Sequence, residues 1–275
     1  MKRFVSPSRG DLRTIEFIER GRSLAAWCPD DEIFTLAREL ILDRVYERGG
    51  VRLRPGLGLV VDAGAHVGIF SLQAAQWADK VVALEADPVN HAVLEANVHR
   101  NRVNNVVPLD EALWTESVSA VSFRRADHSG GGCVSQAGMD GVRGISLDDL
   151  IDQFGPIDLL KIDIEGAEYE VFEVARRLGD VHEIVGELHV DSRDDHRAGK
   201  LADLLSSSGF EVSIISETEL YGHEALCRVL ANRRALAHES VTKILCASYL
   251  LAPITKPIRA PGATYDLPLL TARRP

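Results

Sequence analysis

The sequence predicts an α/β fold in which a mostly parallel β-sheet is covered by helices on both faces. From residue 56 onward, short apolar runs alternate with longer stretches that have helical spacing. Strands that alternate with helices in this way form parallel sheets, which are buried on both faces. Such sheets bind ligands at the carboxyl ends of their strands, and the polar motifs of this chain fall at those ends.

The composition favours one large domain and a small-molecule partner. The chain has 275 residues, and no Pro-, Ser- or Gly-rich linker divides it. A formal net charge of −10, with no long Lys or Arg run, argues against nucleic acid and anionic membranes as partners. The four cysteines have neither C-x-x-C nor zinc-site spacing, so we expect reduced thiols in a cytoplasmic protein.

We divide the chain into three parts. Residues 1–55 are expected to be a helical extension, because apolar residues between 33 and 45 follow helical spacing. Residues 56–232 hold the alternating strands and helices, and the Pro-rich tail 233–275 is expected to flank the core. The apolar run Ile244–Ala252 is too short to span a bilayer, and it suggests a homodimer contact.

Within the middle part, each apolar run is an expected strand and each stretch of helical spacing an expected helix. The expected strands are 57–62, 80–85, 105–109, 118–123, 157–162, 183–189, 210–215 and 225–230. The expected helices are 68–78, 88–100, 146–153, 168–178 and 197–208. Residues 127–144, which include three consecutive glycines and few apolar side chains, are expected to be a mobile loop.

A glycine-containing turn follows the first of these strands and begins a helix. Its sequence is Asp62-Ala63-Gly64-Ala65-His66-Val67-Gly68. Gly64 lets the backbone approach a ligand closely, and Gly68 allows close packing of the helix. The start of the helix offers free N–H groups to a ligand. We therefore expect Asp62, Gly64, Ala65, His66 and Gly68 to bind a cofactor, His66 through its backbone.

Acidic residues follow the next two strands. Glu85, followed by Ala86, ends the second strand and can accept hydrogen bonds from both hydroxyls of an adenosine ribose. After the third strand, Glu111 is placed to meet the adenine amine, and the Ala112 N–H to meet a ring nitrogen. Strand, glycine turn, helix, strand and terminal acid, in this order, predict an adenosine-type cofactor.

The turn favours S-adenosylmethionine over a dinucleotide. The fingerprint G-x-G-x-x-G is missing, because His66 stands at its second glycine and Ile69 follows Gly68. A pyrophosphate would lose its closest approach to the backbone at such a turn. S-adenosylmethionine carries no phosphate and tolerates a bulkier turn.

Four segments together resemble the FkbM-type methyltransferases: Asp62–Leu72, Ala83–Pro88, Leu147–Leu150 and Ile157–Glu168, the last containing KIDIEGAE. The resemblance implies a Rossmann-like class I methyltransferase fold with a seven-stranded sheet. It also implies methyl transfer from S-adenosylmethionine to hydroxyls, often on sugars or polyketide-type natural products. His66 stands where many members carry Asn. Substrate choice is expected to lie outside the resembling segments and in the Gly-rich loop.

Candidate catalytic residues follow two strands that are neighbours in the usual order of this fold. Asp163 and Glu165 follow one strand, and Glu187 and His189 share a face of the next. We expect Asp163, Glu187 and His189 to converge beside the methyl group, with Asp163 also contacting the cofactor. Lys161 is expected to pair with a neighbouring carboxylate.

An alcohol is a poor nucleophile while it keeps its hydroxyl proton, so the acceptor needs help to lose it. Two mechanisms for this step remain open. In one, His189 or Asp163 is a general base and the other acids orient it. In the other, Asp163, Glu187 and His189 hold a divalent cation that acidifies the hydroxyl. An imidazole in the ligand set suits manganese better than magnesium.

The leading hypothesis is an O-methyltransferase that acts on a hydroxyl of a sugar, an oligosaccharide or a polyketide-type natural product. The alternatives are an N-methyltransferase acting on a small amine, a nicotinamide-dependent oxidoreductase and a catalytically silent adenosine-binding protein. The missing glycine disfavours the oxidoreductase. The presence of both Asp163 and Glu165 disfavours a silent protein.

Overall fold

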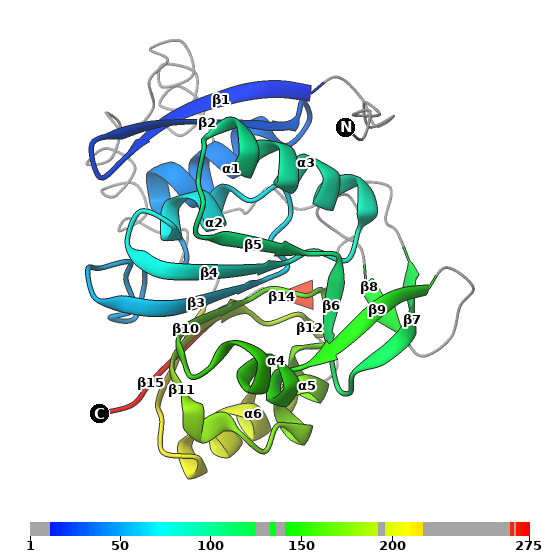
Figure 1. Ribbon diagram of the computed structural model, residues 1–275. Helices are drawn as coiled ribbons and strands as arrows, with labels where there is room; N and C mark the ends of the chain where they lie inside the picture. Colours follow the sequence, from blue (N-terminus) through cyan, green and yellow to red (C-terminus); the bar gives the residue numbers. More distant parts are fainter. Residues whose placement is uncertain (1–11, 125–132, 136–140, 192–195, 217–264, 267) are drawn as a thin grey trace.

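A seven-stranded sheet forms the centre of the molecule (Figure 1). The computed structural model describes residues 12–124, 133–135, 141–191, 196–216, 265–266 and 268–275. The strand order is β13-β15-β11-β10-β3-β4-β5, and only β15 runs against its neighbours. The strands are β3 (Leu57–Ala63), β4 (Ala78–Leu84), β5 (Val106–Leu109), β10 (Ile157–Ile162), β11 (Val181–Glu187), β13 (Glu211–Ile215) and β15 (Leu269–Arg273). The predicted α/β fold with a mostly parallel sheet is confirmed.

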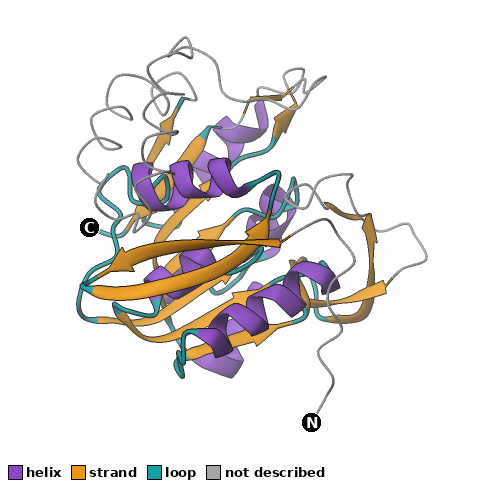
Figure 2. Ribbon diagram, turned by 90° about the horizontal axis from the view of Figure 1, so that it is seen from above, coloured by secondary structure: helices purple, strands orange, loops and turns teal. Residues whose placement is uncertain are grey.

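Helices cover both faces of this sheet (Figures 1 and 2). One face carries α2 (Ile69–Ala74) and α3 (Pro88–Arg100), and the other carries α4 (Leu147–Phe154), α5 (Glu168–Val174) and α6 (His196–Ser207). Val60 and Val61, consecutive residues of β3, belong to two different core clusters. Since successive side chains of a strand point to opposite faces, a strand buried on both faces is apolar throughout.

Local capping explains why two helices begin where the sequence predicts. The Asp87 carboxylate accepts a hydrogen bond from the Val89 N–H at 2.8 Å, and Pro88 occupies the first turn of α3. The Ser146 hydroxyl accepts one from the Asp149 N–H at 3.1 Å at the start of α4. Both caps are local in sequence, and the observed span of α3 equals the predicted one.

The described N-terminal residues are a hairpin followed by helical turns, which corrects the expectation of a helical extension at the hairpin. Strands β1 (Leu12–Glu19) and β2 (Arg22–Pro29) pair antiparallel. Helical structure follows in α1 (Ile33–Leu36) and the π-helical turn η1 (Ala37–Asp43), where the apolar spacing predicts it. Buried residues alternate with exposed ones along β1, which is the pattern of a strand with one covered face. The hairpin shares a core cluster with β3.

Strand β2 packs against α3. Two asparagine side chains of α3 make the hydrogen bonds to the β2 backbone that a neighbouring strand would otherwise make. The Asn97 side-chain oxygen accepts from the Trp27 N–H at 2.7 Å, and its amide group donates to the Trp27 carbonyl at 2.9 Å. Asn101, one turn further along α3, pairs with Ala25 in the same way. Two polar residues four positions apart therefore fasten the hairpin to the helix.

The C-terminal residues complete the sheet, which corrects the expectation that 233–275 only flank the core. Strand β15 lies between β11 and β13 and pairs antiparallel with both. The expected partner of β13, residues 225–230, lies outside the described residues. The same holds for Ile244–Ala252 and its expected homodimer contact.

A second sheet covers part of the stretch that we expected to be a mobile loop. Its order is β6-β9-β7-β8, from β6 (Glu111–Trp114), β7 (Val118–Arg124), β8 (Cys133–Ser135) and β9 (Gly141–Ser146). The described parts of 127–144 are thus strands. They are held by pairing with strands elsewhere in the second sheet, and the glycines of this stretch do not prevent that pairing. The remaining elements are η2 (Leu178–Asp180), β12 (Val190–Asp191) and β14 (Tyr265–Asp266). No helix in the described ranges combines the length and the apolar character that crossing a lipid bilayer requires.

Candidate active site

The turn after β3 needs its two glycines for packing. Gly64 has a φ of +75°, and a Cβ at this position would lie 1.8 Å from the backbone oxygen of Asp163. Gly68 has a φ of +85°, and its Cβ would lie 2.3 Å from a methyl group of Leu94 on α3. The turn is therefore pressed against the end of β10 on one side and against α3 on the other.

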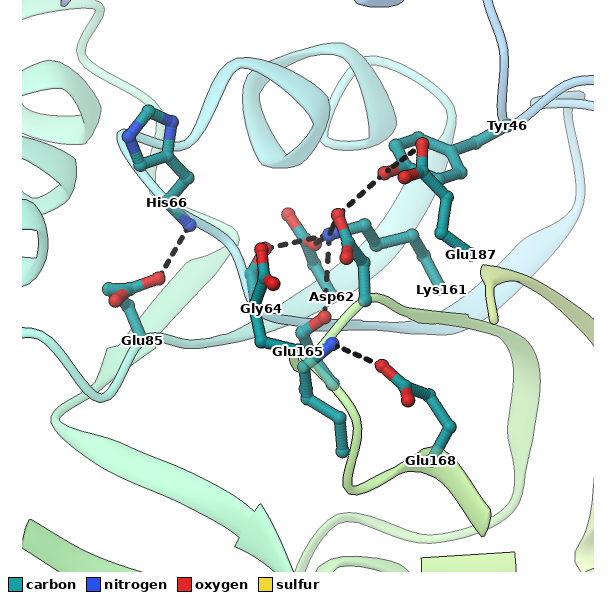
Figure 3. A network of polar contacts seen from close by, with 12 residues as sticks. Tyr46, Asp62, Gly64, His66, Glu85, Lys161, Glu165, Glu168 and Glu187 are labelled. Atoms are coloured by element: carbon teal, nitrogen blue, oxygen red, sulfur yellow. Dashed lines mark hydrogen bonds and ion pairs between the residues drawn. The ribbon is translucent and has the colours of Figure 1, made fainter. Parts of the chain in front are cut away.

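Glu85 follows β4 and holds this turn through backbone hydrogen bonds (Figure 3). Its carboxylate accepts from the His66 N–H at 2.7 Å and from the Asp87 N–H at 2.8 Å. The side chain is almost fully buried, and this burial raises the pKa of Glu85 to about 7 although both N–H groups oppose the shift. His66 has a φ of +52°, and its ring nitrogen lies 3.2 Å from the Glu32 carboxylate.

Ala86, the residue after Glu85, packs against a small apolar cluster. Ala112 and Ala167 are buried in one cluster, against which Ala86 and Ile164 pack. The neighbouring Glu111 is ion-paired with Arg143 at 3.1 Å. The structure thus brings Ala86 and Ala112 into one cluster. The Glu111 carboxylate, which we expected to meet the adenine amine, is paired with the Arg143 guanidinium instead.

These residues fit an adenosyl group. Each Glu85 carboxylate oxygen accepts one backbone N–H and keeps a further lone pair, which a ribose hydroxyl could use. A flat base suits the apolar side chains of Ala86, Ala112 and Ile164. The turn around Gly64 packs against Asp163 and Ile164, which follow β10. An adenosine-type cofactor bound here would extend its other end toward Asp163.

Lys161 is a buried cation that ties β10 to β3. Its ammonium lies 3.3 Å from the Asp62 carboxylate and donates to the Gly64 carbonyl at 2.7 Å. Burial alone would lower the pKa of Lys161, but the carboxylates of Asp62 and Asp163 outweigh it and raise the pKa. Lys161 therefore stays charged and pairs with a carboxylate, as the sequence suggested.

Tyr46 reaches the site from the N-terminal part, and nothing in the sequence pattern indicated it. Its hydroxyl donates to Asp163 Oδ2 at 2.8 Å and lies 3.5 Å from Glu187 Oε1. Burial raises the pKa of Tyr46, and the two carboxylates raise it further, so the hydroxyl stays a neutral donor. In Figure 3, Tyr46 and Glu187 lie on one side of Lys161, and His66 and Glu85 lie on the other.

His189 lies between two glutamates. Its Nδ1 is 3.0 Å from Glu168, its Nε2 is 3.2 Å from Glu165, and Nε2 is 3.9 Å from Asp163 Oδ1. Burial alone would lower the pKa of His189, but the hydrogen bonds from Glu165 and Glu168 raise it well above its ordinary value. Both ring nitrogens therefore already face a carboxylate partner, which makes the ring poorly placed to take the proton of an acceptor.

Asp163, Glu187 and His189, which we expected to converge, lie near one another but contact different neighbours. His189 follows the end of β11, so it does not share a strand face with Glu187. Asp163 is near both, but Glu187 contacts Tyr46 whereas His189 contacts Glu165 and Glu168. Burial, with repulsion from Asp163 and Glu39, raises the pKa of Glu187 well above its ordinary value.

Glu168 does more than favour the start of a helix. It is the first residue of α5, is fully buried, and its Oε1 accepts from the N–H groups of Ile164 and Gly166 at 3.0 and 3.2 Å. These bonds hold the loop that carries Glu165, whose φ is +60°. A non-glycine residue in the left-handed region is uncommon and occurs often at functional sites.

Comparisons with known proteins identify the family of this chain. Residues 62–212 match the model of the methyltransferase FkbM domain. AMB antimetabolite synthetase AmbE of Pseudomonas aeruginosa is 30% identical over an alignment of 235 positions, which covers 67% of this chain and 11% of that protein. The chain therefore spans only a small part of AmbE.

Two further proteins carry FkbM in their names. The 31-O-demethyl-FK506 methyltransferase FkbM of Streptomyces tacrolimicus is 29% identical over 238 residues, covering 73% of this chain and 90% of that protein. The crystal structure of methyltransferase FkbM from Methylobacillus flagellatus is 14% identical, with a TM-score of 0.49, covering 84% of this chain and 47% of that chain. Since the family model matches more than half of the sequence and includes the glycine turn, Glu85 and Asp163, the chain belongs to the FkbM methyltransferase domain family, whose members use S-adenosylmethionine.

Proposed function

We propose that this protein transfers the methyl group of S-adenosylmethionine to a hydroxyl of a small acceptor, such as a sugar, an oligosaccharide or a polyketide-type natural product. One observation carries the proposal: Asp163 lies directly against the glycine turn of the cofactor site and accepts a hydrogen bond from Tyr46. The name of the Streptomyces relative, which gives it a 31-O-demethyl substrate, supports oxygen as the accepting atom. A net charge of −10 supports an acceptor other than nucleic acid or a membrane.

The residues divide into a cofactor side and an acceptor side. Glu85, Ala86, Ala112 and the turn at Gly64 would hold the adenosyl group. When bound, S-adenosylmethionine supplies a methyl group on a positively charged sulfur, which makes that carbon an electrophile. Positioning of the acceptor oxygen in line with the carbon–sulfur bond then supplies much of the rate.

Asp163 is the residue we assign to accept the hydroxyl proton. His189, the other base that the sequence suggested, has both ring nitrogens paired with the carboxylates of Glu165 and Glu168. Asp163 Oδ2 is fixed by the Tyr46 hydroxyl, and the Lys161 ammonium lies 3.9 Å from the same oxygen. Both contacts orient the carboxylate toward the site.

Calorimetry and turnover together test the proposal. We expect S-adenosylhomocysteine to bind and NAD to give no heat, and we expect methylation of hydroxylated acceptors but not of matched amines. Asp163→Asn should reduce turnover at least a hundredfold while the affinity for S-adenosylhomocysteine changes little. Methylation of amines, with turnover unaffected by Asp163→Asn, would show an N-methyltransferase instead, since a neutral amine needs no strong base.

A further inference from the structure

We propose that Asp163, Glu168 and His189 form a binding site for a divalent transition-metal cation. The three residues come from the end of β10, the start of α5 and the segment after β11. One ligand atom of each lies within 4.8 Å of the other two. Two carboxylates and an imidazole at such distances can close around a cation with small side-chain rotations.

An independent observation on Glu168 points to a ligand. The side chain is fully buried, and its Oε2 has no hydrogen-bond partner among the described residues. Burying a carboxylate oxygen without a partner is costly, so native structures seldom leave one in that state. A cation bound to this oxygen would remove the cost.

The surrounding contacts orient the three ligands. Glu168 Oε1 is fixed by the Ile164 and Gly166 N–H groups, which leaves Oε2 as the atom free to bind. Asp163 Oδ2 is held by Tyr46, and its other oxygen lies 3.9 Å from the Nε2 atom of His189. Hydrogen bonds of this kind, outside the ligand shell, fix ligand orientation in metal sites.

This ligand set differs from the one that the sequence suggested. Glu187 is replaced by Glu168, because Glu187 contacts Tyr46 and does not share the group of ligand atoms around His189. The imidazole nitrogen favours manganese, iron or zinc over magnesium, which prefers oxygen ligands only. We therefore expect Mn²⁺ to bind more tightly than Mg²⁺.

The role of the cation rests on the proposed function. A cation beside Asp163 would bind the acceptor oxygen and lower the pKa of its hydroxyl. The hydroxyl proton would pass to Asp163, the proton acceptor assigned above, whose Oδ2 atom is held by the Tyr46 hydroxyl. The new oxygen–carbon bond forms as the carbon–sulfur bond breaks, and its electron pair stays on sulfur.

The site can be tested by electron paramagnetic resonance of Mn²⁺ without any acceptor. The full chain, free of a histidine tag and treated with EDTA, is titrated with Mn²⁺, whose free signal falls as the ion binds. We expect one Mn²⁺ per chain, nitrogen modulation in the spin-echo signal from the imidazole, and competition by Mg²⁺ only at much higher concentration. Glu168→Gln and His189→Asn should each weaken binding at least tenfold, and His189→Asn should remove the nitrogen modulation.

Glu187→Gln is the matched control, since it removes a neighbouring carboxylate that we exclude from the site. It should bind Mn²⁺ as the unmodified chain does. Less than one Mn²⁺ per chain, absence of nitrogen modulation in the unmodified chain, or equal weakening by Glu187→Gln would overturn the proposal. The nitrogen signal needs no variant, so misfolding of Glu168→Gln does not affect that result. Because no acceptor is present, Mn²⁺ binding without methylation of hydroxyls would reject the proposed function and keep the metal site.

Discussion

Glu85 makes cofactor affinity depend on pH, and the size of this dependence can be worked out. In the free protein its pKa is about 7, because burial disfavours the ionised form. Ribose hydroxyls donate hydrogen bonds to the carboxylate, so cofactor binding favours ionisation and lowers this pKa. The bound state therefore holds fewer protons than the free state, and affinity must fall as the pH falls below 7.

If binding returns the Glu85 pKa to its ordinary value of 4.5, about half a proton is released per cofactor at pH 7 and nearly one at pH 6. The affinity for S-adenosylhomocysteine then falls roughly tenfold between pH 8 and pH 6, which corresponds to about 1.4 kcal/mol. Above pH 8 the curve should be flat, since Glu85 is ionised in both states.

Calorimetric titration in two buffers of different ionisation enthalpy measures both quantities. Glu85→Gln is the control, because it removes the titrating group but keeps an acceptor, and any titration of the ligand's own groups remains in its curve. We expect weaker binding and no proton release from Glu85→Gln at pH 6. An affinity of the unmodified chain that stays constant from pH 8 to pH 6, or the same pH dependence in Glu85→Gln, would refute the reasoning.

Three further predictions concern packing and orientation. Gly64→Ala should lower the free energy of unfolding in urea by more than about 3 kcal/mol, because the new Cβ meets the Asp163 backbone oxygen. Gly56→Ala is the control, since Gly56 has a φ of +92° and nothing within 4 Å of a new Cβ. It should cost only about 1–2 kcal/mol of backbone strain. Equal losses would show that contact with β10 does not matter. Tyr46→Phe should lower kcat by roughly 10–100-fold with unchanged affinity for S-adenosylhomocysteine, since a hydrogen bond to a charged group contributes about 1.5–3 kcal/mol. Tyr169→Phe is its control, because the Tyr169 hydroxyl has no hydrogen-bond partner among the described residues, and a similar loss there would contradict the assignment. Asn97→Ala should cost about 2–4 kcal/mol of unfolding free energy, because it leaves backbone groups of β2 unpaired, and an unchanged denaturation midpoint would argue against this attachment of the hairpin.

The parts of the fold that could be predicted from the sequence are those that local interactions decide. The cap at Asp87 and the proline after it mark the start of α3, and apolar runs mark β3 and β10. The glycine turn was found because a backbone with positive φ demands glycine there. In each case the cause lies within a few residues of the effect.

The parts that could not be predicted depend on partners far away in the chain. Tyr46 and Asp163, which share a hydrogen bond, are 117 positions apart. Glu168 has the spacing of an ordinary first-turn acid, and only its contact with His189 distinguishes it. Strand β15 is a short apolar segment near four prolines, and its place between β11 and β13 is decided by the sheet rather than by its own sequence. The helical spacing between 33 and 45 does not extend back to residues 12–29, where the antiparallel pairing of β1 and β2 decides the structure.

The position of β15 has a consequence for the order in which the protein can fold during synthesis. About fifty residues separate β13 from β15, so the ribosome needs about 3–10 s between releasing the two strands. Throughout this interval β11 and β13 are unpaired edges, which invite pairing with other chains. The backbone next to His189 also lacks its final hydrogen bond during this interval, since the Leu188 N–H donates to the Pro268 carbonyl. A nascent chain therefore carries a complete cofactor turn well before it carries a complete acceptor site, and chaperones would act in this interval.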